Sequence, residues 1–128
     1  MKNQSAPIPT EAQEQECLMR WAAYQRAAYP QLSLLIHIPN EGKRSVVEGA
    51  MLKRMGLRPG VPDLILPVSD GKHNCLFIEM KRTKKSRISP DQKQWIDDLN
   101  KAGCKAMVCY GWEDAAKNIL KYIRGECE

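Results

Sequence analysis

The chain has 128 residues, of which 43% are hydrophobic and 27% are charged. These proportions exclude collagen, a coiled coil and an intrinsically disordered chain, and no apolar run approaches the roughly 18 residues that a membrane-spanning helix needs. The 20 lysines and arginines exceed the 15 acids, for a net charge of +5. We therefore expect one cytoplasmic domain over residues 1–128 that does not contact a membrane, with residues 1–9 as a flexible arm.

Signals for helices and strands alternate along the chain. Thr10 followed by Gln13 is the capping pattern of a helix start, and Ser89-Pro90 followed by Gln92 repeats it. Periodicity and turn residues first predict a helix from residue 10 to Pro30, a buried strand 32–38 and a helix 46–55. Strands 63–68 and 75–80 follow, paired as a hairpin. The chain then continues with a helix between Ser89 and Gly103, a strand 104–110 and a last helix that ends near residue 123. This order is that of an α/β domain whose mixed β-sheet carries helices on its faces.

Basic residues gather in one segment. Five of the seven residues from 81 to 87 are lysine or arginine, a density that suits a polyanionic partner. A solvated basic loop explains such a run equally well. No glycine-rich phosphate loop and no G-x-S-x-G motif occur in the sequence, so we expect no small-molecule organic cofactor.

One acid-x-lysine triplet differs from the other three that the sequence contains. Glu79-Met80-Lys81 ends an apolar strand, where the two-residue period places Glu79 and Lys81 on the same face. A solvated ion pair of little energetic value is the alternative interpretation of these two side chains.

Asp63 begins the preceding strand of the hairpin. If residues 68 and 75 paired across the turn, Asp63 would lie opposite residue 80, and a shift of one residue would place it beside an ionisable side chain of that triplet. Two converging carboxylates repel each other, and a hard divalent cation removes the repulsion; oxygen ligands favour Mg²⁺ or Mn²⁺ over zinc. Such an ion next to a lysine indicates phosphodiester hydrolysis. Taken alone, Asp63 would equally be a strand-start carboxylate that bonds its own turn.

Four segments occur in a specific order, although each is common alone: Gly60-Val61-Pro62-Asp63, Glu79-Met80-Lys81, Ser89-x-x-Gln92 ahead of Trp95, and Val108-Cys109-Tyr110-Gly111. Together they resemble the VRR-NUC (virus-type replication-repair nuclease) branch of the PD-(D/E)xK nuclease superfamily, from Thr10 to about Ile123, in the stand-alone form that phages and bacteria carry. The resemblance implies an α/β, restriction-endonuclease-like fold with a central mixed β-sheet flanked by α-helices. It also implies a homodimer that cleaves DNA with Mg²⁺ or Mn²⁺, on branched structures such as Holliday junctions, in replication, recombination or repair.

The same resemblance assigns roles to individual residues. Asp63 and Glu79 would be metal ligands, the Met80 carbonyl would be a third ligand, and Lys81 would be the catalytic lysine.

Two further catalytic candidates, Glu11 and Gln92, match the family pattern less uniquely. Glu11 and Gln15 have the spacing of a glutamate and a glutamine in the family's first helix. Glu14 and Glu16 are close enough to compete, and an acid there also complements the helix dipole. Gln92 matches the family's glutamine after the lysine, but a capping box favours Gln or Glu at this position regardless of function.

Basic and polar residues near the predicted site are candidates for contacts with DNA phosphates, with a plain solvated surface as the alternative. They are Asn40, Lys43, Arg44, Arg58, Arg82, Lys84, Lys85 and Arg87. The leading hypothesis is therefore a metal-dependent, structure-selective endodeoxyribonuclease. A non-catalytic nucleic-acid-binding module on the same fold is the alternative. A sequence-specific restriction-type enzyme is a weaker one, because no region is large enough for a base-reading element.

Overall fold

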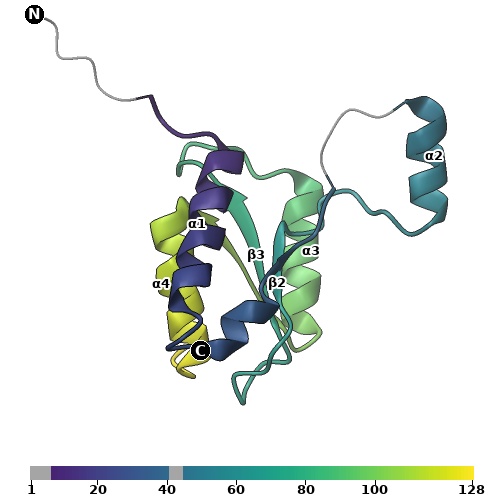
Figure 1. Ribbon diagram of the computed structural model, residues 1–128. Coiled ribbons are helices and arrows are strands. Elements are labelled where there is room, and N and C mark those ends of the chain that lie inside the picture. Colours follow the sequence, from purple (N-terminus) through teal and green to yellow (C-terminus); the bar gives the residue numbers. More distant parts are fainter. Residues whose placement is uncertain (1–6, 41–44) are drawn as a thin grey trace, which may run out of the picture.

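A computed structural model of the chain describes residues 7–40 and 45–128 (Figure 1). Its elements are α1 (Glu11–Gln25), the 3₁₀ helix η1 (Pro30–Leu34), β1 (Ile36–His37), α2 (Val46–Arg54), β2 (Leu64–Leu66), β3 (Leu76–Lys81), α3 (Pro90–Lys101), β4 (Lys105–Tyr110) and α4 (Trp112–Ile123).

The four strands form one mixed sheet in the order β1-β2-β3-β4. β2 is antiparallel to both β1 and β3, and β4 runs parallel to β3. Helices α1 and α4 cover one face of the sheet and α3 covers the other (Figure 1). The predicted α/β architecture with helices on both faces of a mixed sheet is therefore confirmed.

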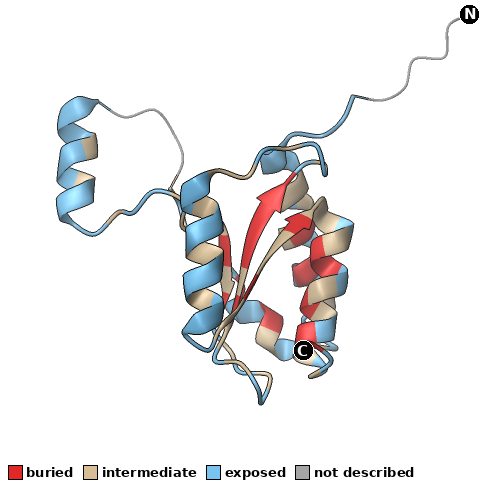
Figure 2. Cartoon of the chain, turned by 180° about the vertical axis from the view of Figure 1, so that it is seen from behind, coloured by how far each residue is buried: buried red, intermediate tan, exposed pale blue. Residues whose placement is uncertain are grey.

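The main core lies between the sheet and the pair α1 and α4. Side chains that point to this face are almost inaccessible, as the red segments of Figure 2 show. They include Leu18, Ala22, Leu64, Leu66, Leu76, Ile78, Met80, Cys109, Ala115, Ile119 and Tyr122. The alternation along β3 leaves Phe77, Glu79 and Lys81 on the opposite face, toward α3. The core thus fixes the strand from which the ionisable side chains project.

Polar contacts hold α3 against the second face. Asn100 forms two hydrogen bonds with the backbone of Ala106 in β4, at 2.8 and 3.0 Å. The indole of Trp95 donates to the carbonyl of Pro59 at 2.9 Å. Ser89 and Gln92 form the predicted capping box at the start of α3. The first turn of α3 is therefore fixed next to the segment that leads into β2.

The strand predicted over 32–38 is wrong for most of its length. Pro30 starts the 3₁₀ helix, and only Ile36 and His37 form a strand. Leu32 and Leu35, three residues apart, are both buried, whereas Leu34 and Ile36 are about half exposed. A one-face burial pattern of this spacing suits a helical turn, and the continuous apolar run concealed it.

The predicted hairpin is confirmed, but its register is not the symmetric one. Leu66 pairs with Leu76 and Leu64 with Ile78, so continuation of the register places Asp63 opposite Glu79. β2 ends at Leu66 because the backbone turns there, with the Val68 N–H bonded to the Leu66 carbonyl at 2.9 Å. The one-residue shift that would join the two carboxylates is the register that forms.

Two predictions fall partly outside the described residues. Of the arm expected over 1–9, residues 1–6 are not described; residues 7–9 have no regular secondary structure, and the Ile8 carbonyl accepts a hydrogen bond from Arg82. Lys43 and Arg44 also lie outside the described part of the chain.

Helix α2 stands apart from the sheet (Figure 1), and no residue of it is buried. Large apolar side chains of α2 and of its C-cap are open to solvent, with exposed fractions of 90% for Val46, 77% for Val47 and 75% for the C-cap residue Met55. Within the described ranges, no helix combines the length and apolar character needed to cross a membrane.

Gly60 lets the chain pass directly over the first turn of α3. Its φ of +85° is in the left-handed region, and a Cβ atom on it would lie 2.6 Å from the Asp91 carbonyl carbon and 2.8 Å from the Gln92 nitrogen. Both are backbone atoms that cannot rotate away. Only glycine therefore fits between β2's approach segment and α3.

We predict that Gly60→Ala lowers the free energy of unfolding by about 2–4 kcal/mol, because it adds a backbone clash to an unfavourable φ. Chemical denaturation measures the change. Gly71→Ala is the matched control, since Gly71 has a similar φ of +93° but open space around it. Equal losses for the two variants would contradict a close approach at Gly60.

Candidate active site

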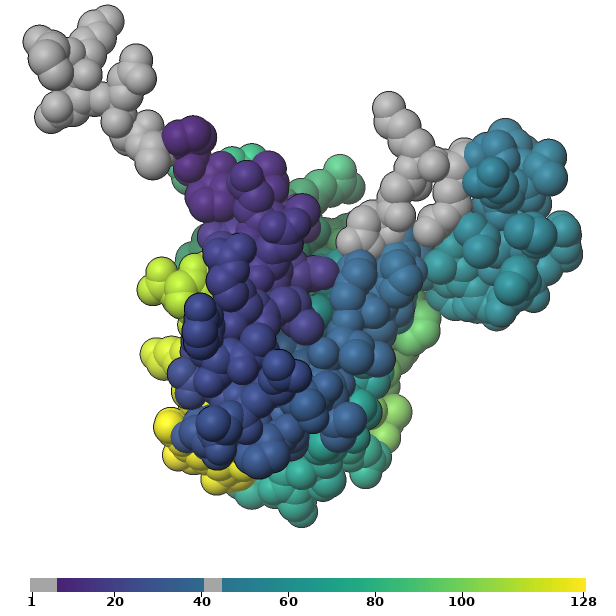
Figure 3. Space-filling view, in the orientation of Figure 1, coloured from purple at the N-terminus to yellow at the C-terminus, as the bar shows by residue number. Residues whose placement is uncertain are grey.

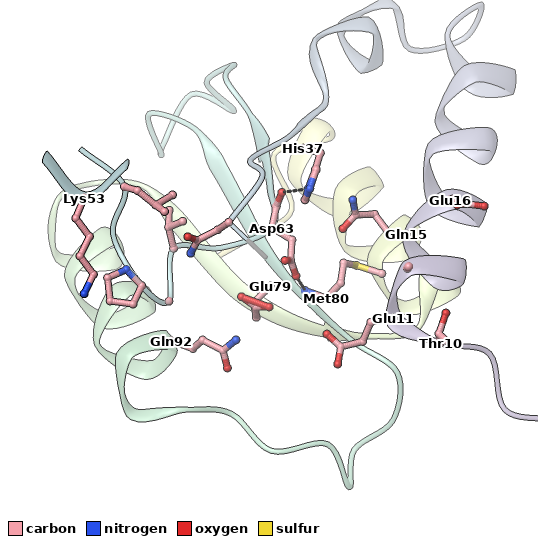
Figure 4. Close-up of a pocket in the computed structure, with 16 residues that line it drawn as sticks. Thr10, Glu11, Gln15, Glu16, His37, Lys53, Asp63, Glu79, Met80 and Gln92 are labelled. Carbon is pink, nitrogen blue, oxygen red and sulfur yellow. Dashed lines mark hydrogen bonds between the residues drawn. The ribbon is translucent and has the colours of Figure 1, made fainter. Parts of the chain in front are cut away.

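A cleft with a cavity of about 860 Å³ opens at the end of the sheet where β2 begins and β3 ends (Figures 3 and 4). Its walls are the first turns of α1, the end of β1, the approach to β2, the start of α3 and the end of α2. The lining residues are Thr10, Glu11, Ala12, Gln15, Glu16, His37, Asn40, Lys53, Leu57, Pro59, Gly60, Val61, Asp63, Glu79, Met80 and Gln92.

Three carboxylates converge in this cleft. One oxygen each of Glu11, Asp63 and Glu79 lies within 4.8 Å of the other two. They come from α1, from the residue before β2 and from β3. The structure therefore brings together the three acids that the sequence pointed to.

Asp63 is fixed by both its backbone and its side chain. Its carbonyl accepts from the Ile38 N–H at 2.7 Å and from His37 Nδ1 at 2.9 Å, while Oδ2 accepts from the Met80 N–H at 2.7 Å. Just beyond the last residue pair of β2 and β3, the carboxylate thus accepts the hydrogen bond that a backbone carbonyl of the neighbouring strand would otherwise accept. This bond aims the carboxylate across the strand end toward Glu79.

Glu79 is 3% exposed, and its pKa is raised to about 9. Burial is the largest cause, followed by the hydrogen bond and the negative charge of Asp63; Lys81 lowers the pKa and Glu11 raises it. With this raised pKa, Glu79 keeps its proton at neutral pH when no cation is bound.

Lys81 lies next to this pair on the same face of β3 and is only 6% exposed. It does not line the cleft, but its positive charge acts on Glu79. Burial of both side chains excludes the solvated surface pair that was the alternative for Glu79 and Lys81. A buried ammonium beside acids is a feature of sites that handle charge in reactions as well as of structural networks.

The Met80 carbonyl points toward the side of the strand on which Asp63 lies. The neighbouring Lys81 carbonyl accepts from the Gly111 N–H on the β4 side, and carbonyls alternate sides along a strand. The Met80 carbonyl therefore points to the side of Asp63, where its own N–H already donates. It borders the cleft as a further neutral oxygen.

The choice among the acids of α1 is settled by packing. Glu14 accepts from the Trp112 N–H at 2.8 Å and so caps α4, whereas Glu11 joins the carboxylate cluster. Glu16 borders the cleft, but Figure 4 shows its carboxylate directed away from Asp63. Gln15 lies one turn after Glu11 and faces the cleft (Figure 4).

Gln92 belongs both to the capping box of α3 and to the lining of the cleft, the two positions expected from the sequence. Its Oε1 accepts from the Ser89 N–H at 2.9 Å as part of the capping box, and the residue also lines the cleft. Because the oxygen is used by the cap, the amide nitrogen is the group left for the cleft, and Figure 4 shows it on the side of Glu79.

The predicted phosphate contacts fall into two groups. Arg82, Lys84, Lys85 and Arg87 are exposed in the loop that follows β3. Asn40 and Arg58 also form internal hydrogen bonds: Asn40 donates to the Arg58 carbonyl, and Arg58 donates to the carbonyls of Lys53, in the last turn of α2, and of Leu57. Asn40 lines the cleft, and Arg58 braces the turn that follows α2.

Two cleft residues were missed from sequence, His37 and Lys53. His37 is half-buried and holds the backbone of Asp63 through its hydrogen bond to the Asp63 carbonyl. Its position at a strand end just before Pro39-Asn40 was a usable signal. Lys53 had none, because only the path of α2 brings it to the cleft.

The donor set fits a hard divalent cation. All three converging side chains are carboxylates with oxygen donors. Burial first, and then the neighbouring Asp63, raise the pKa of Glu79, so its charged form lacks a compensating partner. A divalent ion bound by oxygens would replace the Glu79 proton. Glu11, Asp63 and Glu79 are the residues that would hold it, with the Met80 carbonyl beside them.

Comparison with known proteins places the chain in a family. Residues 5–113 match the VRR-NUC domain, which covers most of the sequence. The chain belongs to the VRR-NUC family. A solved structure of a VRR-NUC domain protein is 32% identical, superposes with a TM-score of 0.81, and aligns over 93% of this chain and 92% of its own. Curated proteins gave no match.

The VRR-NUC assignment confirms the resemblance seen in the sequence and the PD-(D/E)xK-type fold. VRR-NUC is a nuclease family, and the cluster of acids at the end of β3 is consistent with the divalent metal that nucleases of this kind use.

We predict that the metal-free protein loses stability between about pH 5 and pH 9, through Glu79. The folded state holds its proton up to a pKa of about 9, but the unfolded chain releases it near 4.5, so the free energy of unfolding falls as pH rises through this window. Thermal unfolding in EDTA should show a steeper decline for the native protein than for Glu79→Gln.

Glu113→Gln, which removes an exposed acid of α4, is the control and should keep the native slope. Addition of Mn²⁺ should flatten the native curve, because the ion takes the place of the proton. Parallel curves for the native protein and Glu79→Gln in EDTA would show that Glu79 is not protonated in the folded state.

Proposed function

We propose that this VRR-NUC protein is a Mg²⁺- or Mn²⁺-dependent endodeoxyribonuclease that cuts branched DNA, such as Holliday junctions, in phage or bacterial replication, recombination or repair. The observation that carries the proposal is the convergence of Glu11, Asp63 and Glu79 within 4.8 Å at the base of an open cleft. The buried Lys81 lies beside them at the end of β3, and the loop that follows β3 is rich in basic residues.

The proposal divides the site residues into metal ligands and a buried lysine that acts on the phosphate. Glu11, Asp63 and Glu79 would hold the ion, with the Met80 carbonyl as a neutral ligand. When bound, the ion supplies a water of lowered pKa and neutralises charge on the phosphate. Lys81 contributes a positive charge that stabilises the negative charge developing on the phosphate, in a buried position where such a charge acts strongly.

Gln92 and the basic loop would position the substrate. The Gln92 oxygen is fixed by Ser89, so its amide is oriented before substrate arrives and can donate to a phosphate or to the attacking water. The exposed side chains of the loop that follows β3 would bind the DNA backbone, and such contacts do not read sequence. They are Arg82, Lys84, Lys85 and Arg87.

Selection by DNA shape is supported by what the fold contains. In the described ranges, the chain consists of the sheet, the helices that cover it and α2. This leaves backbone contacts and the geometry of the cleft as the means of choosing a substrate, as the resemblance to stand-alone family members implies.

We predict metal-dependent cutting of a labelled four-way junction and flap in Mg²⁺ or Mn²⁺, slower cutting of linear duplex, and none in EDTA. Asp63→Asn and Lys81→Met should each lower the single-turnover rate at least about 100-fold, because one removes a metal ligand and the other a buried charge at the reacting phosphate. Neither variant should weaken DNA binding in EDTA more than about threefold.

Lys101→Met is the matched control for the lysine, since Lys101 is exposed on α3 and pairs with Asp97; it should cut at the native rate. Steeply salt-dependent binding with no metal-dependent cutting would favour the non-catalytic binding module. Equal cutting of linear and branched DNA would contradict selection by structure.

We further propose that the protein acts as a homodimer. The support is the apolar stripe of α2, formed by Val47 and Met51 with the C-cap residue Met55, which recur every four residues and are exposed by 77%, 45% and 75%. Contiguous exposed apolar patches are a feature of protein–protein interfaces.

Light scattering should therefore give twice the monomer mass of 14.6 kDa. Val47→Ser combined with Met55→Ser should weaken the dimer at least about 100-fold, because each buried apolar side chain contributes about 1.5 kcal/mol or more. Tyr24→Ser, which alters an apolar residue of α1 that is 81% exposed, is the control. A monomeric native protein at high micromolar concentration would refute the dimer.

A further inference from the structure

The cleft carries an unbalanced set of charges. Four acidic residues line it, Glu11, Glu16, Asp63 and Glu79, and the carboxylates of Glu11, Asp63 and Glu79 converge there. Among the described residues that line the cleft, Lys53 is the single lysine or arginine. Among the described residues, Lys53 is thus the cationic side chain that a polyanion contacts at the cleft surface, while Lys81 acts from its buried position behind Glu79.

Lys53 faces the acids from the opposite wall. It lies in the last turn of α2, and Figure 4 shows it across the cleft from Glu11, with Asp63 and Glu79 between the two. At 100° per residue it projects from the face of α2 opposite to Met51 in the apolar stripe. Its position is thus compatible with burial of that stripe by a second copy of the chain.

The end of α2 that carries Lys53 is braced, although α2 buries none of its residues. Arg58 Nη1 donates to the Lys53 carbonyl at 3.3 Å and to the Leu57 carbonyl at 3.2 Å. Asn40 donates to the Arg58 carbonyl at 2.9 Å, which ties this turn to the segment after β1.

The same turn is also tied to α3. The Trp95 indole holds the Pro59 carbonyl at 2.9 Å, and Gly60 touches the backbone of the first turn of α3. Residues 57–60 therefore connect the backbone of Lys53 to the two walls of the cleft. A flexible lysine stem on a braced backbone can follow a phosphate without losing its place in the cleft.

We propose that Lys53 binds a backbone phosphate of the DNA strand that lies across the carboxylate cluster, on the side opposite to α1. Arg58 and Asn40 act as positioning residues that hold the turn carrying Lys53. The inference rests on the proposed nuclease function and adds to it a contact that anchors the substrate from α2.

The test measures DNA binding in EDTA, where no cutting occurs, as a function of salt. A fluorescent junction and a duplex are titrated with native protein, Lys53→Ala, Lys53→Arg and the control Lys117→Ala, which removes an exposed lysine of α4. Loss of one phosphate contact lowers the slope of log Kd against log salt by about 0.9. Lys53→Ala should show this loss, whereas Lys53→Arg and Lys117→Ala should keep the native slope.

Kinetics provide a second readout that a merely structural effect would not give. Lys53→Ala should raise KM about tenfold in Mn²⁺ with kcat within twofold of native, because the contact forms in both ground state and transition state. The double variant Lys53→Ala with Arg58→Ala should bind no more weakly than Lys53→Ala alone, since Arg58 acts through Lys53.

An unchanged slope for Lys53→Ala, or an equal loss for Lys117→Ala, would overturn the inference. Additive losses from Lys53 and Arg58 would show that Arg58 binds a phosphate of its own and would overturn its positioning role. These outcomes differ from failure of the proposed function, in which native protein neither binds nor cuts DNA. Thermal unfolding of each variant verifies that it is folded.

Discussion

The site depends on one interaction, the forced approach of the Asp63 and Glu79 carboxyl groups. Burial of Glu79, together with the hydrogen bond and the negative charge of Asp63, raises the pKa of Glu79 and disfavours its charged form in the folded protein. The sheet holds them together because the register of β2 and β3 places the two residues opposite each other. The pair must bind either a proton or a cation. At neutral pH the choice depends on metal concentration, so metal occupancy and the stability of the fold are linked.

Hydrogen bonds at the ends of the paired strands β2 and β3 hold the two carboxyl groups close together. β2 pairs with β3 over only three residues, and the Asp63 carboxylate then takes the Met80 N–H as the next rung. His37 and Ile38 hold the carbonyl of the same aspartate. A metal ligand is thereby oriented by backbone hydrogen bonds, which are harder to displace than side-chain contacts. Behind it, the buried face of β3 packs on α1 and α4 and prevents the strand from sliding.

Local signals predicted much of this structure because they act over a few residues. Ser89 and Gln92 form the capping box that their spacing indicated, and strand alternation was enough to place Glu79 and Lys81 together. Such local signals could not predict contacts between residues that are far apart in the sequence. Glu14 was a candidate for the site until packing of α1 on α4 gave it the Trp112 N–H. The register of the hairpin depended on the residue at which β2 ends. Lys53 reaches the cleft only because of the path that α2 takes.

Net charge describes this protein poorly, because opposite charges are separated in space. The total of +5 combines the exposed basic side chains of the loop that follows β3 with a cleft whose centre holds the carboxylates of Glu11, Asp63 and Glu79. In the proposed function, DNA attracted by the basic loop would be repelled by these acids until a divalent ion neutralised them. Metal binding and close approach of a phosphate to Glu79 would then be coupled, and each would strengthen the other by the same factor. The proposed contact of Lys53 would reduce the repulsion on the α2 side of the cleft, so the bound DNA strand would lie toward that wall.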